Sequence, residues 1–553
     1  MNRRNPTMAT HSCAAGRIGI PIRHLAAVKP VKVLSTPGLH SGVQDASDLL
    51  KRLFRGFDGN LALRLWDGTT LRMGNPTHDD TLPEFTLVCR SPNVVRSMVL
   101  GRDLMRLPEA YFRGDIDIEG DFFAALGIKD QLHSIRMSTL ERIRIMFSAA
   151  RLRTTEAADP GAAIGSPIQG RSVKAHSKTE NREAVAFHYD ISNEFYALWL
   201  DKAMVYSCAY FTRPDDDLDS AQYAKLDHIC RKLLLQPGER LLDIGCGWGA
   251  LVIHAAMHFG VRAHGITLSE RQLTFARKRI AQAGLQDRVS VELRDYRDLP
   301  GDSIYDKVSS VGMFEHVGLK NLPLYFATVN RLLKPSGLFL NHGITHDVEG
   351  WHKTSSTEFI NRYVFPDGQL DTVSNIQRLM ENIRFEIVDV EGLRRHYALT
   401  LRQWVARLER RHLEALLYVS ESTWRVWRLY MAACALEFES GEIGIYQILA
   451  IKRAQGVSAS LPLTRQHLYP AHAPKTADRN AQTKPAGMTE KLVTAPEYGF
   501  FNVATCSWEQ GSTHRINGNI GHGTSLPSIR LRLWQLCISE AAARHTHDKV
   551  TFS

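Results

Sequence analysis

The stretch Arg240-Leu-Leu-Asp-Ile-Gly-Cys-Gly-Trp-Gly-Ala-Leu251 decides the fold class of this chain. A short apolar run ends at Asp243, and glycines follow at positions 245, 247 and 249 before a helical pattern begins. Glycine lets a backbone turn tightly and approach a ligand closely, so the pattern predicts a strand, a tight turn and a helix. In open α/β sheets a ligand binds beyond the carboxyl ends of the strands. The stretch therefore predicts an α/β sheet with a binding site at residues 243–249.

The spacing of these glycines separates several classes of nucleotide site. A nicotinamide site is expected to carry GxGxxG, and a nucleoside triphosphate site GxxxxGK[ST]. Here an acid precedes Gly-x-Gly-x-Gly, and GxxxxGK[ST] occurs nowhere in the chain. The pattern resembles the class I methyltransferases, in which this loop holds the methionine half of S-adenosylmethionine. A strand, turn and helix that bind nothing would be the alternative.

Polar residues follow the next predicted strand, 261–269, where many nucleotide sites carry a carboxylate for the ribose hydroxyls. They are Thr267, Ser269 and Gln272. These side chains can bind a sugar, but without a charge-assisted hydrogen bond. The third strand, 289–296, ends in Asp295 and Tyr296. A carboxylate there can accept from the adenine amino group while a ring stacks on the adenine face; a turn without a ligand is the alternative.

The run 265–272 (GITLSERQ) and four further segments resemble one family when they are taken as a set. The four are 187–200 (FHYDISNEFYALWL), 205–211 (VYSCAYF), 312–318 (GMFEHVG) and 363–368 (YVFPDG). Their order is similar to that in the cyclopropane-fatty-acyl-phospholipid synthase family, which includes the mycolic acid cyclopropane synthases. The resemblance covers about 181–465 without a gap. Residues 46–150 are more loosely similar to the sterol-carrier-like lipid-binding domain of longer bacterial members.

This resemblance implies an α/β fold: a class I methyltransferase, Rossmann-like, seven-stranded sheet with helical lipid-site insertions, preceded by a smaller α+β domain. We therefore predict a lipid-binding-like domain at 46–153, a linker rich in Ala, Gly, Ser and Pro at 154–180, and a catalytic domain at 181–465. Residues 1–45 and 466–553 resemble nothing in the family. The first stretch is expected to be a flexible lead-in, and the second a disordered tail.

The resemblance also implies a bicarbonate ion whose ligands each have a match in this sequence. The matches are Cys208, Glu315, His342, the backbone of Ile344, and Tyr397. The cofactor is likewise expected to contact Tyr206, Ser207, Thr267, Gln272 and the loop with Asp243, Gly245, Gly247 and Gly249. Each match has a plainer alternative, because a buried cysteine or a lone histidine is often only structural. Extra positive charge before Tyr397, at residues 394–396, departs from the family pattern.

Members of this family place a methylene bridge across the cis double bond of an unsaturated phospholipid acyl chain. An alkene is a poor nucleophile, so a sulfonium methyl must be held almost in contact with it. Methyl transfer leaves a carbocation, and loss of a proton from the new methyl closes the ring. A base in a dry pocket is required, because water would add to the cation. Candidates for an acyl channel, or for plain core, are Tyr189, Phe195, Tyr196, Trp199, Tyr210 and Phe211.

Other functions remain open on the sequence alone. The same fold can serve a methyl-branching or hydroxyl-forming lipid methyltransferase, or an amine N-methyltransferase. The full set of bicarbonate ligands favours cyclopropanation, because an amine acceptor needs no base to deprotonate a methyl. A non-catalytic lipid-binding protein is disfavoured by the intact glycine loop and by Glu315. Nucleic-acid methylation fits the positive charge, but no Asn-Pro-Pro-Tyr or Pro-Cys motif accompanies the loop.

The composition indicates where in the cell the chain acts and what kind of partner it binds. The 553 residues carry a formal net charge of +10, which favours an anionic partner such as a membrane face. The eight cysteines are scattered without CxxC pairs, so neither a zinc site nor a disulfide framework is expected. The N-terminus lacks the apolar core of a secretory signal, and no apolar run is long enough to span a membrane. We expect a cytoplasmic protein, peripheral to the inner face of the membrane, that acts on phospholipid and not on nucleic acid.

Residues 130–153 are the candidate for a helix that lies on a membrane surface. Apolar positions recur there at helical spacing among several arginines. These arginines are Arg136, Arg142, Arg144, Arg151 and Arg153. An ordinary solvated helix face is the alternative. By resemblance alone, a homodimer formed through the N-terminal domain is also expected.

Overall fold

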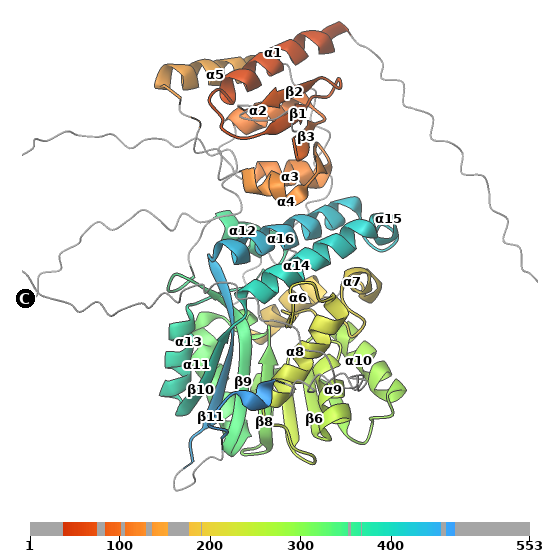
Figure 1. The fold of residues 1–553 in the computed structure, drawn as a ribbon, viewed down its shortest axis with the longest axis vertical. Coiled ribbons are helices and arrows are strands. Elements are labelled where there is room, and N and C mark those ends of the chain that lie inside the picture. The colour runs from red at the N-terminus through yellow and green to blue at the C-terminus, as the bar shows by residue number, and fades with distance from the viewer. Residues whose placement is uncertain are drawn as a thin grey trace, which may run out of the picture.

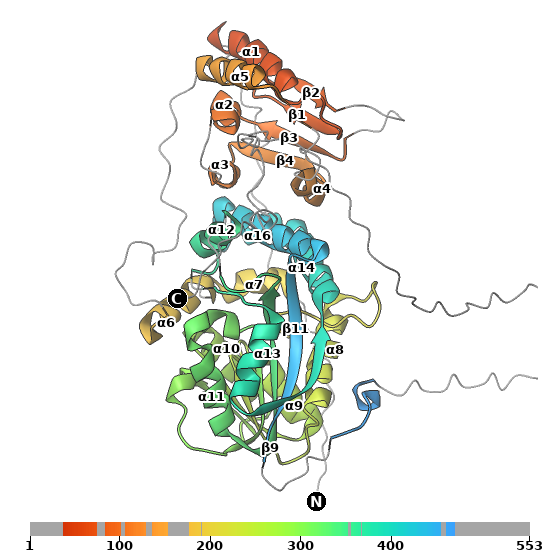
Figure 2. The same cartoon turned by 90° about the vertical axis from the view of Figure 1, so that its left-hand side faces the viewer.

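The computed structural model describes residues 37–74, 83–100, 105–128, 135, 137–152, 176–189, 191–351, 355–366, 368–454 and 461–469. These residues form two bodies, a smaller α+β body from the N-terminal part and a larger α/β body, one above the other in Figures 1 and 2. Residues 1–36, most of the predicted linker and residues 470–553 lie outside the described stretches.

The smaller body is built on a four-stranded sheet in the order β2-β1-β3-β4. β1 (Leu61–Arg64) and β2 (Thr70–Met73) form an antiparallel hairpin around Asp67-Gly68. β3 (Phe85–Cys89) pairs in parallel with β1, and β4 (Ile116–Gly120) pairs antiparallel with β3. The helices of this body are α1 (Pro37–Leu53), α2 (Pro92–Leu100), α3 (Arg106–Arg113), α4 (Phe122–Gly127) and α5 (Thr139–Arg151).

Two helices of the smaller body begin elsewhere than the sequence suggests. α1 begins at Pro37, inside the predicted lead-in, because buried apolar residues recur at helical spacing over residues 43–53. α5 begins at Thr139 instead of near residue 130. The Ser138 hydroxyl caps the helix at this point, because it accepts a hydrogen bond from the Glu141 N–H at 3.2 Å.

The larger body contains a seven-stranded sheet in the order β10-β11-β9-β8-β5-β6-β7. Neighbouring strands from β9 to β7 run parallel, and β11 runs antiparallel to both of its neighbours, β9 and β10. This sheet confirms the predicted seven-stranded α/β fold. The strands are β5 (Arg240–Ile244), β6 (Arg262–Thr267), β7 (Val289–Leu293), β8 (Tyr305–Val311), β9 (Leu333–His346), β10 (Phe385–Gly392) and β11 (Ile443–Lys452).

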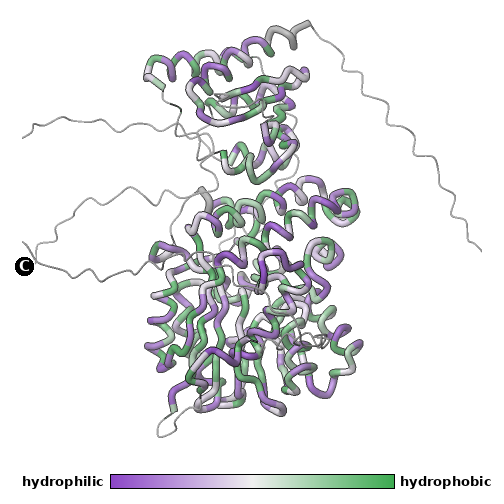
Figure 3. The backbone as a smooth tube through the Cα atoms, viewed as in Figure 1, coloured by the Kyte–Doolittle hydropathy of each residue, from purple (hydrophilic) through white to green (hydrophobic). Residues whose placement is uncertain are grey.

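Helices cover both faces of this sheet (Figures 1 and 2). Successive side chains of a strand point to opposite faces, so Leu241 and Leu242 of β5 belong to different cores. Leu241 packs with α8 (Leu218–Lys232), α9 (Ala250–Phe259) and α10 (Glu270–Gln282). Leu242 packs with α11 (Leu322–Leu332) and α13 (Val373–Asn382). In Figure 3 hydrophobic stretches follow the strands of the sheet, and mixed stretches follow the outer helices.

A further group of helices joins the sheet to the smaller body. Its members are α6 (Lys178–Tyr189), α7 (Asn193–Trp199), α12 (Ser355–Tyr363), α14 (Arg394–Arg410), α15 (His412–Ala415) and α16 (Glu421–Ser440). Arg425 of α16 pairs with Asp117 at 3.2 Å, and the Arg428 guanidinium lies 3.8 Å from the centre of the Phe122 ring. Buried apolar residues of the smaller body and of these helices also belong to one continuous hydrophobic core, which includes residues of both α1 and α16.

The described C-terminal segment, 461–469, packs beside α8 and ends in the short turn η6 (Gln466–Leu468), where Leu468 is buried. The five cysteines within the described stretches are free thiols. Among the helices that the structure describes, none is both long and apolar enough to cross a membrane.

Candidate active site

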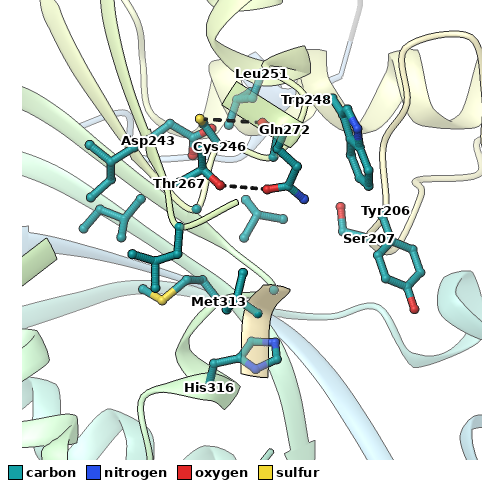
Figure 4. A pocket seen from close by; sticks show the side chains of 18 of the residues that line it. Tyr206, Ser207, Asp243, Cys246, Trp248, Leu251, Thr267, Gln272, Met313 and His316 are labelled. Atoms are coloured by element: carbon teal, nitrogen blue, oxygen red, sulfur yellow. Dashed lines mark hydrogen bonds between the residues drawn. The ribbon is translucent and has the colours of Figure 1, made fainter. Parts of the chain in front are cut away.

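A pocket opens at the carboxyl ends of β5, β6 and β8, where the sequence predicts the binding turn (Figure 4). Gly245, Gly247 and Gly249 have positive φ values of 83°, 54° and 84°. Gly245 and Gly247 line the pocket, and a Cβ on Gly245 would lie 2.9 Å from the Met313 side chain. Gly249 is outside the lining; it begins α9 and faces Ala276. The loop therefore uses glycine both for its left-handed backbone and for close packing.

Asp243 is the buried carboxylate at the end of β5, and it lines the pocket. It accepts a hydrogen bond from the Ser309 hydroxyl at 2.7 Å. Burial raises the pKa of Asp243 to about 6, although the Ser309 hydrogen bond and the Lys225 charge act in the opposite direction. The carboxylate is therefore ionised at neutral pH but loses its charge in mild acid.

Lys225 faces the same pocket from α8, and no sequence motif points to it. Its ammonium donates to the Ser207 hydroxyl at 3.0 Å. Burial lowers the pKa of Lys225 to about 8, while nearby acids, Asp201 most strongly, raise it. Ser207 and Tyr206, both predicted to contact the cofactor, line the pocket (Figure 4). The pocket thus holds a buried cation as well as the Asp243 carboxylate.

The polar residues after β6 divide into two roles. Thr267 and Gln272 line the pocket, and the Thr267 hydroxyl donates to Gln272 Oε1 at 2.7 Å (Figure 4). Ser269 is outside the lining; its hydroxyl accepts from the Gln272 N–H at 3.2 Å and caps α10. Because Thr267 occupies the carbonyl oxygen of Gln272, a ligand at this point would accept from the amide nitrogen.

Asp295 and Tyr296 form one wall of the pocket beyond β7. The two oxygens of Asp295 accept from the Arg297 guanidinium at 2.8 and 2.6 Å. The Tyr296 ring meets Tyr325 edge-on with centroids 5.3 Å apart, and burial raises the pKa of the Tyr296 phenol to about 12. Arg297, a residue that the motifs do not suggest, therefore fixes the carboxylate that was predicted to meet adenine.

An aromatic cluster borders the pocket. Trp248 lines the pocket, donates from its indole N–H to Asn193 at 2.8 Å, and lies 5.1 Å from the Tyr196 ring. The members of the aromatic cluster are Phe195, Tyr196, Trp199, Tyr206, Trp248, Trp404 and Trp427. Three of the predicted channel residues, those on α7, thus lie next to the cofactor pocket.

The remaining predicted channel residues lie elsewhere. Tyr210 stacks against His228 and His396, with centroid distances of 4.2 and 4.8 Å. Phe211 also lies beside His396. The side chain of Tyr189 is outside the described part of the chain. Whether the aromatic cluster forms an acyl channel stays a prediction.

A second group of predicted residues gathers beside the pocket and forms what we term the polar cluster. Its members are Cys208, Glu315, His342, Ile344 and Tyr397. Ser207 and His316 line the pocket, and each is the direct sequence neighbour of a member, Cys208 or Glu315. Cys208 and Glu315 therefore lie beside the pocket, and so does His342, whose carbonyl oxygen accepts from the N–H of the lining residue Gly312 at 2.8 Å.

Glu315 lies in the short turn η4 (Phe314–His316) and is only 7% exposed. Its Oε1 accepts from the Ile344 N–H at 2.8 Å, whereas its buried Oε2 has no hydrogen-bond partner among the described residues. Burial raises the pKa of Glu315, although the Ile344 hydrogen bond lowers it. The Ile344 N–H, predicted to contact an ion, thus donates to Glu315 in this structure.

His342 lies on β9 and is completely buried. Its Nδ1 is 3.1 Å from the Gln447 amide nitrogen on β11, and its Nε2 has no partner within the described stretches. Burial holds the pKa of His342 well below its ordinary value, and the Lys225 and Lys232 charges lower it further. The ring is therefore neutral at pH 7. With Gln447 as the donor, Nδ1 accepts and Nε2 carries the ring proton.

Cys208 and Tyr397 meet at one backbone carbonyl. The Cys208 sulfur lies 3.8 Å from the Leu393 oxygen, which also accepts from the Tyr397 N–H at 3.1 Å. Burial raises the pKa of both side chains, and the charges of Tyr206, Cys208 and Glu315 raise the Tyr397 pKa further. Both groups are therefore protonated at neutral pH and can donate hydrogen bonds.

Comparisons with known proteins place this site in a family. A family model described as mycolic acid cyclopropane synthetase matches residues 176–448. A probable fatty acid methyltransferase of Pseudomonas putida is 42% identical over 411 residues, which cover 74% of this chain and 96% of that protein. The cyclopropane-fatty-acyl-phospholipid synthase of Escherichia coli K12 is 41% identical over 280 residues, which cover 50% of this chain and 69% of that protein. The chain belongs to the cyclopropane-fatty-acyl-phospholipid synthase family.

Membership of the cyclopropane synthase family makes the chain an S-adenosylmethionine-dependent methyltransferase. The match to the Pseudomonas putida protein is longer than the stretch 176–448, so it extends beyond the part that the family model covers. The solved structure of the cyclopropane synthase MmaA2 of Mycobacterium tuberculosis is 33% identical and covers 49% of this chain and 98% of its own, with a TM-score of 0.47.

Three residues of this synthase-family site were missed by the motifs: Lys225, Arg297 and Gln447. Lys225 lies within α8, whose sequence gives no sign that this lysine is buried. Gln447 could have been found, because it is a single amide inside the apolar strand IGIYQILAIK. A lone polar residue in a buried strand is expected to bond to another buried polar group.

Proposed function

We propose that this family member transfers a methylene group from S-adenosylmethionine to the cis double bond of an unsaturated phospholipid acyl chain. The observation that carries this proposal is a pair of buried atoms without partners in the described chain, Glu315 Oε2 and His342 Nε2, beside the cofactor pocket. An unpaired buried polar atom costs about 1–3 kcal/mol. Each atom therefore favours a polar partner. In the proposal that partner is one small ligand, because an alkene acceptor is the substrate class whose chemistry needs a bound base.

In this proposal the pocket binds different parts of the cofactor with different residues. Asp243 accepts from the ammonium of the methionine half, which the turn at Gly245 and Gly247 allows to approach closely. The Gln272 amide nitrogen, held by Thr267, donates to the ribose. The Tyr296 ring stacks on the adenine from the far wall of the pocket.

The polar cluster fits a small oxyanion such as bicarbonate. His342 Nε2 and the Tyr397 hydroxyl are donors, and Glu315 Oε2 is a further polar atom without a partner among the described residues. The Cys208 thiol becomes a third donor if it turns away from the Ala209 oxygen, 3.3 Å from its sulfur. When bound, the ion would supply a base for the proton that leaves the new methyl group. The Ile344 N–H orients Glu315 toward this position, and Gln447 orients His342.

The overall reaction balances as one alkene and one sulfonium giving one cyclopropane, one thioether and one proton. The chain has two tasks besides binding. The aromatic cluster offers π faces that stabilise positive charge on the acyl chain. Its packed rings also exclude water, which would otherwise add to the cation and give an alcohol.

A second candidate is a lipid methyltransferase whose product is methyl-branched or hydroxylated. The name of the Pseudomonas putida relative supports it, because "probable fatty acid methyltransferase" names methyl transfer to a fatty acid. Such an enzyme would use the same cofactor pocket, but its carbocation would give a methyl branch or a hydroxyl group in place of a ring. An amine acceptor is disfavoured, since amine methylation needs no buried base.

Mass spectrometry of the lipid product distinguishes these functions. Vesicles of phospholipid with a cis-unsaturated chain would be incubated with the full-length protein and S-adenosylmethionine. We expect a gain of one CH₂ with loss of the double bond. A retained double bond or an added water would establish the second candidate instead. Unchanged lipid, with S-adenosylhomocysteine still bound by the protein, would contradict both.

A further inference from the structure

The turn between α14 and α16 exposes a compact apolar surface. Leu413, Leu416, Leu417 and Tyr418 are 81%, 37%, 76% and 42% exposed. These four residues form what we term the hairpin tip, which lies with α15 at the free end of the α14–α16 pair (Figure 1). Apart from the tip and α5, the exposed large apolar residues of the described chain stand singly in the sequence. A contiguous apolar surface of this kind is typical of a docking site.

Charges around the tip favour an anionic partner. Each carboxylate between residues 407 and 421 has a basic neighbour: Glu409–Arg428 at 2.5 Å, Glu414–Arg411 at 3.3 Å and Glu421–Arg425 at 2.8 Å. Arg410, by contrast, is exposed and forms no ion pair with any described residue. The tip thus presents apolar side chains beside an unneutralised guanidinium, with no unneutralised acid.

Two helices connect the tip directly to the proposed site. α14 carries Tyr397 and Trp404 before the tip, and α16 carries Trp427 after it. From Tyr397 to Arg410, α14 spans about 20 Å at 1.5 Å per residue. One leaflet of a bilayer contributes about 15 Å of hydrocarbon. Because the polar cluster is farther from the tip than one leaflet is deep, a phospholipid must leave the leaflet at the tip and move along the α14–α16 pair to bring the middle of its chain to the cluster.

We infer that the hairpin tip docks the protein on an anionic phospholipid bilayer. Leu413, Leu417 and Tyr418 enter the boundary between head groups and acyl chains, while Arg410 stays among the phosphates. The inference rests on the proposed function in that it names the surface from which the site takes its lipid. The other occupant to be tested is a second copy of this chain.

Flotation of the full-length protein with vesicles tests the inference. The vesicles contain phosphatidylglycerol and phosphatidylethanolamine with cis-unsaturated chains. The Leu413→Ser/Leu417→Ser variant should show a partition coefficient lower by at least ~100-fold, because burying one leucine side chain is worth roughly tenfold or more. The midpoint of thermal unfolding and the binding of S-adenosylhomocysteine should not change, since both leucines are exposed.

The Leu140→Ser/Phe147→Ser variant of α5 is the matched control. It removes two side chains with similar exposure, 71% and 64%, from the smaller body. We expect its flotation to equal that of the wild type, although α5 is the helix that the sequence suggested for a membrane surface. Loss of flotation in this variant alone would transfer the docking role to α5 and overturn the inference.

Three further results separate the remaining outcomes. Wild-type flotation of the tip variant would overturn the inference. So would a wild-type dimer that becomes a monomer in the tip variant by light scattering without lipid, because the tip would then join two copies. Turnover of the same lipid in detergent micelles should be equal for both proteins. If the wild type forms no product there, the proposed function fails, while flotation still decides the docking.

Discussion

The cofactor pocket and the polar cluster are neighbours, but they satisfy their polar groups in different ways. In the pocket, polar side chains hold one another in pairs: Thr267 with Gln272, Asp295 with Arg297, Asp243 with Ser309 and Lys225 with Ser207. In the polar cluster, Glu315 Oε2 and His342 Nε2 have no partner among the described residues. Most polar side chains of the pocket named here thus have a partner within the chain, whereas in the proposal the two atoms of the cluster have a small ligand as their partner. Substitutions should accordingly change affinity in the first and turnover in the second.

The largest effect is expected for Glu315→Gln. In the proposal Glu315 helps to hold the bound base, and the amide changes both the charge and the donor at that point. Turnover on unsaturated vesicles should therefore fall at least ~100-fold, the low end for loss of a positioned acid–base assembly. The dissociation constant of S-adenosylhomocysteine should change less than about threefold, because Glu315 does not line the pocket. Product mass spectrometry and titration calorimetry measure the two quantities.

The control for this variant is Glu386→Gln, which removes an exposed carboxylate from the same body. Both quantities should equal those of the wild type in the control. Near-wild-type turnover of Glu315→Gln would remove the polar cluster from the mechanism. Loss of cofactor binding in that variant would show that the two regions do not act separately.

Asp243→Asn tests the cofactor pocket. The amide can still accept from Ser309 but loses a charge-assisted hydrogen bond to the cofactor ammonium, a bond worth about 1.5–3 kcal/mol. The affinity for S-adenosylhomocysteine should therefore fall about 10- to 100-fold, and kcat at saturating S-adenosylmethionine should change little. A reduced kcat with unchanged affinity would place Asp243 in catalysis and contradict this division.

Mild acid should also weaken the binding of S-adenosylhomocysteine, but to a smaller extent. Burial raises the pKa of Asp243 to about 6, and a cationic ligand binds only the ionised carboxylate well. The affinity for S-adenosylhomocysteine should be close to its maximum at pH 7, about twofold weaker at pH 6 and about tenfold weaker at pH 5. The measurement ends at pH 7, because Lys225, with its pKa near 8, titrates beyond it. In Asp243→Asn the affinity should not depend on pH in this range; a flat wild-type profile would contradict the prediction.

The sequence predicts the pocket better than it predicts the partners of the pocket residues. The glycine spacing after Asp243 places a turn at the end of a strand, because few other residues tolerate such a backbone. The polar cluster followed only from resemblance, since its residues come from separate loops and strands. Lys225 and Arg297 could not be predicted, because burial and pairing depend on tertiary packing. The polar cluster also depends on Gln447, whose partner is a strand distant in sequence.

Ser269 shows that one local signal can be interpreted in two ways. The sequence suggested that its hydroxyl binds the ribose, because it follows β6 beside Thr267. Yet Ser269-Glu-Arg-Gln272 also fits the capping-box pattern, in which a serine accepts from the N–H three residues later. The structure places Ser269 in that second role, outside the lining of the pocket.

The smallest effect is therefore expected for Ser269→Ala. Loss of the cap should lower the free energy of unfolding by about 1 kcal/mol, measured by urea denaturation. The affinity for S-adenosylhomocysteine should stay within about twofold, because the Gln272 side chain is still held by Thr267. Thr267→Val, which keeps the shape and removes that hydroxyl, is the matched comparison and should weaken the affinity more than the stability. If Ser269→Ala instead weakened cofactor binding as much as Thr267→Val does, the serine would contribute to the pocket through the position of α10. The residues that shape the pocket would then include the first turn of α10, in addition to those that the hydrogen bonds identify.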